Sequence, residues 1–438
     1  MRTFWLTILA LAAAKSCGAT DALSPRPHIT CFPNPCPGEH RTFPLREKLC
    51  YVKSTGDGQD DSQHILNAVY ECNNGGRVVF REGVNYTIGT ALDLTFMKNI
   101  DLDIQGYIQF TDNTTYWQDN SFQFVFQNAT SFWLWGGDGV AVYGGGTING
   151  NGQVWYDLYA KDPLLNRPSL IGIEGLHNSV ISNLNLRQSP TYHFFMANSS
   201  EVVIDGLSLI SVSSNDNEAA NTDGIDTYRS NNVALQNWVV NNGDDCVSFK
   251  PNSTNMLVQN MQCTGSHGIS VGSLGQYPNT YSIVENVYVY NVSMISALTG
   301  ARVKVWPNTP SSEAADLQGG GGSGRVNNVV FDTFTVKDVD YAIELDQCYG
   351  QSNLTLCFDN PSPLNISNVI FKNFQGITSS KYAPDIVTFA CSSTTSCSNI
   401  QAMNIDVQGP EGSLAYCHDV DESSLVGVNC TGPYKGFE

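Results

Sequence analysis

The residues whose types and spacing could carry chemistry lie in one stretch, 221–273. It contains the motifs NTDG, GDDC and SHG, and Asp223, Asp245 and His267 follow one another at intervals of 22 residues. Such a regular interval predicts that the chain coils with the same period, which would bring these side chains together on one face. Asp244 belongs to the same group because it directly precedes Asp245.

Two cations follow this stretch. Arg302 and Lys304 stand two residues apart in the run ARVKVW, so they lie on the same side of a strand. Acids, one imidazole and two cations in a single groove suit the hydrolysis of an acidic sugar. One carboxylic acid would protonate the leaving oxygen, another carboxylate would activate water, and the cations would hold the substrate's carboxylate. Crowded carboxylates raise one another's pKa, so one of them can stay protonated.

Each of these residues also has a purely structural explanation. Asp after Gly is common in turns, and a lone histidine is usually structural. The shared interval, and the position of His267 in a Ser-His-Gly loop, favour a site instead. A calcium site is the remaining alternative, because clustered acids bind hard cations. The nearby arginine and lysine argue against calcium, and we expect no metal and no other cofactor.

The elements that must position this group are short β-rich runs, which dominate from about residue 78 and are punctuated by Asn and Gly. A four-residue pattern recurs at NLNL (Asn183), GLSL (Gly206), NWVV (Asn237), NMQC (Asn260) and NVYV (Asn286), with weaker copies at Thr333 and Asn373. Repeats this short predict an all-β chain, a single-stranded parallel β-helix, rather than a propeller or a sandwich. Asn at one corner of successive coils could bond to its neighbours above and below. Equivalent residues on adjacent coils would lie about 4.8 Å apart.

The first 50 residues precede these repeats and differ from them. Residues 1–19 are typical of a secretory signal, whose apolar run is too short to span a membrane. Residues 20–50 form a Cys- and Pro-rich arm, and residues 51–438 are expected to form the catalytic β-helix. The run GDGQDDSQHILNAVYECNNGG predicts a helix that Asp60 or Asp61 can cap and that Gly75-Gly76 ends. This N-terminal helix would cover the open first coil.

Composition and charge limit the partners. The net charge of −19 excludes nucleic acid, which requires basic patches. Removal of the signal would leave twelve cysteines, an even number suited to disulfides in an oxidising compartment. Nine N-x-S/T sequons support the same route, and we expect a secreted, glycosylated monomer without a membrane anchor. The sequons are at Asn85, Asn113, Asn128, Asn198, Asn252, Asn291, Asn353, Asn365 and Asn429.

The cysteine spacing favours local disulfides. Cys246 with Cys263 would tie two adjacent catalytic coils, and Cys391 with Cys397 would close a small loop. Further candidates are Cys348 with Cys357 and Cys417 with Cys430. Pairing among the remaining four stays open: Cys31, Cys36, Cys50 and Cys72.

The motifs resemble those of a known family. NTDG, GDDC, SHG and RVK match, in order, the four signature motifs of the polygalacturonases, glycoside hydrolase family 28. GGGTINGNGQVWYD, at 144–157, resembles the family's G-x-I-x-G-x-G-x-x-W motif, and DQCYG carries Tyr349 where the family has a substrate-contacting tyrosine. The resemblance covers nearly all of the chain after about Gly56. Ser266 replaces a glycine found in many members, which leaves His267 in place.

This resemblance implies a right-handed parallel β-helix that hydrolyses α-1,4-linked galacturonic acid with inversion. Asp244 would be the proton donor, and Asp223 and Asp245 would position and activate water. His267 would support the protonation state of the acid.

The resemblance also bears on where the substrate is cut. Arg302, Lys304 and Tyr349 would bind the sugar's carboxylate. The region from Arg302 onward looks like that of the fungal exo-acting branch, in which Trp306 and added loops close one end of the groove. The insertion Ser213–Ala220 supplies more blocking material. A walled groove admits only a chain end, so we expect the release of galacturonic acid from the non-reducing end of galacturonan.

Four other functions stay open at this point. An exo-acting enzyme on rhamnogalacturonan would share these motifs, and an endo-polygalacturonase would need an open groove. A calcium-dependent pectate lyase would use a β-helix of the same kind to make unsaturated products. A non-catalytic wall-binding protein would bind sugar without releasing reducing ends.

Overall fold

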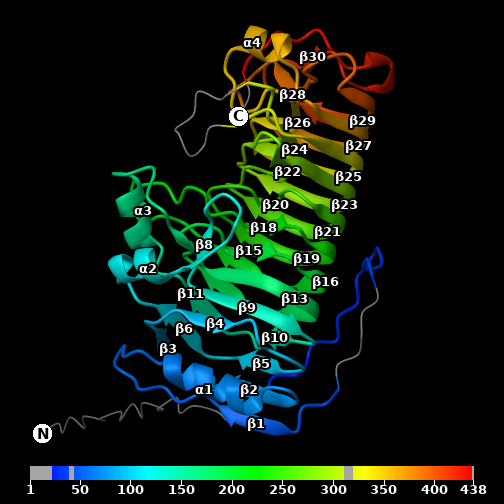
Figure 1. Ribbon diagram of the computed structural model, residues 1–438. Helices are drawn as coiled ribbons and strands as arrows, with labels where there is room; N and C mark the ends of the chain where they lie inside the picture. The colour runs from blue at the N-terminus through cyan, green and yellow to red at the C-terminus, as the bar shows by residue number, and fades with distance from the viewer. Residues whose placement is uncertain (1–21, 39–43, 310–318, 437–438) are drawn as a thin grey trace, which may run out of the picture.

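The computed structural model describes residues 22–38, 44–309 and 319–436, so the predicted signal, 1–19, lies outside the described residues. Figure 1 shows a stack of coils with the N-terminal helix at one end and the C-terminal strands at the other. Neighbouring strands along the stack pair in parallel. The chain forms a right-handed parallel β-helix, which confirms the predicted fold.

One sheet of the stack, called here the groove sheet, carries the site. It contains one short strand from most coils, and the strands pair in chain order. They are β4 (Leu92–Leu94), β9 (Trp133–Asp138), β13 (Ile171–Ser182), β15 (Phe194–Ala197), β18 (Ile225–Tyr228), β20 (Val247–Phe249), β22 (Ile269–Leu274), β24 (Thr299–Val305), β26 (Tyr341–Asp346), β28 (Asp385–Ala390) and β30 (Leu414–His418).

The other side of the stack has two sheets that share long, bent strands. These are β19 (Asn231–Asn241), β21 (Ser253–Thr264), β23 (Tyr281–Ile295), β25 (Ser323–Val339), β27 (Leu364–Thr378) and β29 (Cys397–Gln408). In the N-terminal coils the same two sheets continue as shorter strands. One set is β1 (Lys48–Tyr51), β2 (Gly76–Phe80), β5 (Asp101–Ile104), β10 (Ala141–Tyr143) and β16 (Ser200–Asp205); the other is β3 (Asn85–Ile88), β6 (Tyr107–Phe110), β11 (Thr147–Asn149), β14 (Asn185–Arg187) and β17 (Ser208–Ile210).

Asn residues turn these long strands at two corners of each coil. One corner column has a positive φ at Asn183, Gly206, Asn237, Asn260, Asn291, Thr333, Asn373 and Asn404. The second column does so at Asn178, Glu201, Asn232, Asn255, Asn286, Asn328, Asn368 and Asn399. Asn tolerates this left-handed conformation better than most residues, which explains its repetition. Side-chain amides also bond along each column, as from Asn291 to Asn260 (2.8 Å) and from Asn286 to Asn255 (3.0 Å).

The predicted series of corners contains one error. The sequence pattern placed NVYV at Asn286 after Asn260, but the strand register sets Asn291 beside Asn260. Asn286 belongs to the second column. Because β23 has an Asn at each of its two corners, five residues apart, the local pattern alone could not distinguish them.

The predicted capping helix is α1 (Ser62–Cys72), and it buries Ile65, Val69 and Cys72. Asp60 or Asp61 was predicted to cap it, and the two carboxylates have different partners. The Asp60 carboxylate accepts from the Ser62 amide (2.9 Å), whereas Asp61 accepts from Thr55 and Thr87 and so ties the helix to the first coils. The helix ends at Cys72, before Gly75-Gly76.

Short elements outside the stack complete the chain. They are α2 (Thr114–Asn120), α3 (Gln153–Tyr159), α4 (Leu354–Asp359), one 3₁₀ turn (Glu422–Ser424), and a small sheet of β7 (Phe122–Gln123), β8 (Thr130–Ser131) and β12 (Pro168–Ser169). In Figure 1, α2, α3 and β8 project beyond the N-terminal half of the groove sheet. Within the described ranges, no helix is long and apolar enough to cross a membrane.

The arm runs along the outside of the stack (Figure 1) and is fixed by charge and by apolar contact. Arg26 pairs with Asp101 (2.5 Å), and Asn34 bonds with Gln259 (3.2 Å). Ile29 packs on an outward-facing apolar column that includes Val203 and Leu257. The twelve described cysteines form six disulfides: Cys31–Cys36, Cys50–Cys72, Cys246–Cys263, Cys348–Cys357, Cys391–Cys397 and Cys417–Cys430.

Candidate active site

The strand register places the 22-residue series on adjacent coils. Asp226 of β18 pairs with Ser248 of β20, and Val247 pairs with Ile269 of β22. The residues just before these strands, Asp223, Asp245 and His267, therefore occupy equivalent positions. Their period equals the coil length here because these coils carry no insertion.

Asp244 and His267 form a pair at the surface of this group. The imidazole Nδ1 lies 3.2 Å from a carboxylate oxygen of Asp244. Asn221 donates to the other carboxylate oxygen (3.1 Å), and Arg167 in turn holds Asn221 (2.8 Å). The Asp244 side chain is 14% exposed, against 1% for Asp245. Asp244 is therefore the acid better placed to reach a bound sugar.

The charges around these acids separate their proton affinities. Burial alone would raise the pKa of Asp244, but the adjacent His267 and Lys304 cations outweigh it and lower that pKa below its usual range. Burial, followed by the charges of Asp226 and the neighbouring acids, raises the pKa of Asp223 well above its usual range. Burial would lower the pKa of His267, but its contact with Asp244 raises it. Both shifts favour His267 over Asp244 as the residue that carries the proton of this pair.

Asp245 is held by fixed partners. Lys304 Nζ lies 2.7 Å from one of its carboxylate oxygens, and the Ser270 hydroxyl donates to the other at 2.7 Å. These contacts orient the carboxylate and compensate its charge. The nearest oxygens of the three acids, Asp223, Asp244 and Asp245, all lie within 4.8 Å of one another.

That separation is shorter than expected for inversion. Inverting glycosidases usually hold their two carboxyl groups about 6.5–9.5 Å apart, with a water molecule between acid and base. The expectation of inversion therefore rests on the family resemblance and not on this distance.

The two predicted cations lie at the edge of the acid group and are largely buried. Arg302 pairs with Glu344 (2.8 Å), a partner that the sequence analysis missed. The ring of Tyr349 lies 5.6 Å from the Arg302 guanidinium and 5.7 Å from Lys304 Nζ. A uronate carboxylate placed against Tyr349 would meet both positive charges.

Trp306 lies beside Tyr349 and is largely buried. It is 4% exposed, meets Tyr349 edge-on at 5.1 Å, and packs against Gly350. An indole enclosed in this way supports the ring of Tyr349. The expected substrate contact and groove closure by Trp306 stay predictions.

A second buried ion pair lies below the acids and was also missed. Lys250 Nζ is 3.3 Å from the carboxylate of Asp226, and both residues follow the catalytic motifs by a few positions. Asp226 is fully buried and Lys250 is 7% exposed. The alternation of β18 and β20 could have found them, since Asp226 and Ser248 have the parity of outward-facing residues. Lys250 supplies the positive charge that the buried pair Asp223 and Asp226 would otherwise lack.

The predicted insertion does form a rim. Ser213 and Asn215 of the insertion Ser213–Ala220 bond to Gln153 (3.1 Å) and Asp157 (2.8 Å) of α3, which belongs to the GGGTINGNGQVWYD motif. The insertion and α3 therefore form one surface loop cluster beside Asn221 and the first acid.

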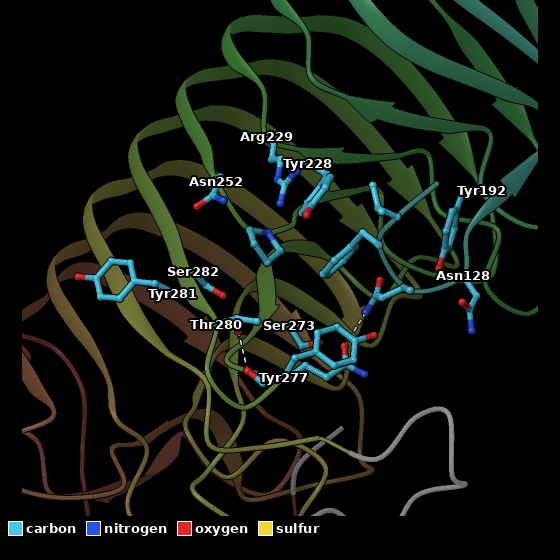
Figure 2. A pocket seen from close by; sticks show the side chains of 15 residues that line it. Asn128, Tyr192, Tyr228, Arg229, Asn252, Ser273, Tyr277, Thr280, Tyr281 and Ser282 are labelled. Carbon is cyan, nitrogen blue, oxygen red and sulfur yellow. Dashed lines mark hydrogen bonds between the residues drawn. The ribbon is translucent and has the colours of Figure 1, made fainter. Parts of the chain in front are cut away.

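A further wall was not visible in the sequence. The β7–β8 loop reaches across the groove sheet, where Phe126 stacks on Tyr228 (4.6 Å) and Gln127 bonds to Gln276 (2.8 Å). Figure 2 shows the cavity of about 870 Å³ that results, with Arg229 beside Tyr228 on one side and Tyr277 and Tyr192 on others. No local signal marks Gln127 and Gln276 as partners, because they are 149 residues apart.

Comparison with known proteins agrees with this geometry. The model of the glycosyl hydrolases family 28 matches residues 81–430. The chain is 57% identical to exopolygalacturonase X of Aspergillus niger, over 94% of this chain and 95% of that one. It is also 57% identical to an exopolygalacturonase of Cochliobolus carbonum, over 90% and 89% of the two chains. The crystal structure of endo-xylogalacturonan hydrolase from Aspergillus tubingensis superposes with a TM-score of 0.79 at 34% identity, covering 89% of this chain and all of that one. The protein belongs to glycosyl hydrolases family 28.

Proposed function

We propose that this protein is an exo-acting hydrolase that releases galacturonic acid from the non-reducing end of α-1,4-galacturonan. The observation that carries the proposal is the wall of the β7–β8 loop, which lines a cavity about one sugar unit from the acid group. A closed end permits a chain terminus and not the middle of a polymer. The names of the relatives at 57% identity support the same activity.

In the proposed mechanism, the Asp244–His267 pair delivers one proton. The His267 imidazolium passes its proton to Asp244, and Asp244 gives that proton to the glycosidic oxygen as the bond to the anomeric carbon breaks, which leaves a neutral imidazole and an ionised carboxylate. This sequence reconciles the lowered pKa of Asp244 with a role as acid. A bound uronate near Lys304 would also offset the positive charge that lowers this pKa.

Water completes the reaction from the buried acids. Asp245, fixed by Lys304 and Ser270, and Asp223 would orient the attacking water, and one of these carboxylates would take its proton. Arg302, Lys304 and Tyr349 would hold the carboxylate of the sugar at the cleavage site. No step in this scheme requires a metal ion.

The product profile tests the proposal. Polygalacturonate digested with the protein should yield galacturonate monomer from the first minutes, with a slow fall in polymer viscosity. A ladder of oligomers at early times would establish endo action, and release only from rhamnogalacturonan would change the substrate. Products absorbing in the ultraviolet, lost on addition of chelator, would indicate a lyase. Proton NMR of the first product gives its anomeric configuration and so tests inversion.

We also propose that the protein is secreted as a glycosylated monomer. Six disulfides suit an oxidising compartment, and every sequon asparagine except Asn252 is exposed. Sedimentation of the protein before and after treatment with a glycosidase that removes N-glycans tests both statements.

A further inference from the structure

The cavity behind the β7–β8 loop contains one charged side chain that the proposed mechanism does not use. Of the described residues, fifteen line it; among these fifteen Arg229 is the only cation and none is a carboxylate. Arg229 is exposed and has no carboxylate partner within residues 22–38, 44–309 and 319–436. In a protein with a net charge of −19, an unpaired arginine facing a cavity points to an anionic ligand.

The cavity lies about one sugar unit from the acids. Asp226 and Tyr228 extend from the same face of β18 and are two residues apart, a step of about 6.6 Å along a strand. Tyr192 lines the cavity and also lies within electrostatic range of Asp223 and Asp244. A sugar chain cut at Asp244 would therefore place its terminal residue among the cavity residues.

The walls suit one ring of this chemistry. Phe126 stacks on Tyr228, and Tyr277 meets Phe126 edge-on at 6.0 Å, so the lining is aromatic where the C–H faces of a sugar would pack. The Arg229 guanidinium lies over the Tyr228 ring, 4.9 Å from its centre. This stacking holds the cation at the rim (Figure 2) before any ligand arrives. The volume of about 870 Å³ is in the range of ligand pockets.

We propose that Arg229 is a specificity-determining residue that binds the carboxylate of the terminal uronate in this cavity. The inference rests on the proposed exo action. It adds a second carboxylate-binding group to the one formed by Arg302 and Lys304. The protein would then recognise the charge of the sugar that it releases, separately from the charge of the sugar that it leaves behind.

The test compares two oligomers that differ only at the non-reducing end. One is tetragalacturonate, and the other carries galactose in place of the terminal galacturonate, so that only the terminal carboxylate is missing. A charge-assisted contact contributes about 1.5–3 kcal/mol, so wild-type kcat/KM should favour the uronate-terminated oligomer by about 10- to 150-fold. Arg229→Met should remove most of that preference by lowering kcat/KM on tetragalacturonate, and Arg229→Lys should keep part of it.

Two controls isolate the effect. Arg81→Met removes a similar arginine that lies 4.3 Å above the Tyr51 ring at the N-terminal end of the stack, and it should keep the wild-type preference. All variants come from one host, because the sequons at Asn128 and Asn252 line the cavity and their glycosylation must stay constant. The melting temperature of Arg229→Met should match that of the wild type, since Met and Arg face the same penalty at a positive φ.

Separate outcomes would overturn the inference and the proposed function. An Arg229→Met variant that loses activity equally on both oligomers, or on neither, would refute the assignment of Arg229 while leaving exo action intact. A wild-type protein that releases no terminal sugar from either oligomer would refute exo action, and the inference with it.

Discussion

The groove sheet and the Asn corners are built by the same coils, yet they treat polar side chains in opposite ways. At the corners, each amide bonds to the equivalent residue one coil away, so Asn286 donates to Asn255 and accepts from Asn328. On the groove sheet, the outward-facing side chains in register are not repeats of one residue. They include Asp226, Ser248, Ser270, Arg302, Glu344 and Thr388.

This difference separates polar groups that hold the fold from polar groups that act. A repeated amide satisfies itself and needs no ligand. Some buried carboxyl groups of the groove sheet lack hydrogen-bond partners by comparison: Asp346 has one oxygen, and Asp385 both oxygens, without a hydrogen bond. Burial raises the pKa of Asp385 to about 6. Buried carboxyl groups with shifted pKa values cluster at functional sites, where the shift serves the chemistry.

The largest expected effect comes from removing the proton donor of the groove sheet, Asp244. Asp244→Asn removes the proton donor but keeps size and polarity, so the rate should fall by about 10²- to 10⁴-fold. Reducing-end release measures it, and the melting temperature should stay close to that of the wild type. Near-normal turnover would contradict the role given to Asp244. Asp205→Asn, at a corner where Asp205 accepts from Asn237, is the control and should keep full activity.

The second largest effect concerns Lys250, the cation beside the buried acids. Lys250→Met leaves the buried carboxyl groups of Asp223 and Asp226 without a cation, which should destabilise the fold by about 3–5 kcal/mol. The folded state of the variant binds protons more readily than the unfolded state, because burial raises the pKa of both acids. The loss should therefore be larger at neutral pH than under acidic conditions.

Thermal unfolding of Lys250→Met at two pH values checks this. The double variant Asp226→Asn/Lys250→Met should recover much of the lost stability, because it removes the unpaired charge. Equal destabilisation at both pH values would show that packing and not charge explains the effect.

A pH profile probes the proton on the Asp244–His267 pair. The pKa of His267 is raised, so the imidazolium persists above the ordinary histidine value of about 6.5 and is lost as the pH rises through the raised pKa. The alkaline limb of kcat/KM should lie above that ordinary value in the wild type. His267→Gln should move it to lower pH and reduce the maximal rate.

His418→Gln serves as the matched control for this profile. His418 stacks on Phe358 at 3.7 Å, on the C-terminal coil, and has no contact with the acids. Its alkaline limb should coincide with that of the wild type. If His267→Gln also coincided with the wild type, the proton would not reside on this pair.

The smallest effect belongs to the corners. Asn286→Ala loses two amide bonds and leaves alanine, which tolerates the left-handed region less well than asparagine, at a φ of 58°, which should cost about 1–2 kcal/mol. Asn286→Gly loses the same bonds but accepts the left-handed conformation, so it should cost less. Urea titration measures both, and activity should change less than about twofold. A marked loss of activity would mean that the corners do more than hold the coils.

What could be predicted from the sequence also depends on this difference between repeated and unrepeated polar residues. The stack of Asp223, Asp245 and His267 was predictable because three consecutive coils there have equal length. The ion pair Arg302–Glu344 was not, since an insertion of unknown size separates Arg302 from its partner. Strand alternation places Asp226 and Lys250 on the outward face, but no motif marks the two as partners. The wall at Gln127 depends on a tertiary contact across several coils, which no local pattern encodes.

The Cys- and Pro-rich N-terminal arm changes how such a stack should unfold. A solenoid whose coils touch only their neighbours tends to fray from its ends, one coil after another. Here the ion pair of Arg26 with Asp101 and the bonds of Asn34 with Gln259 attach one short segment to coils far apart along the axis. Loss of the terminal coils then also costs the contacts of the central ones. The arm therefore turns a one-dimensional array into a more cooperative unit, in which the catalytic coils and the capped end are lost together.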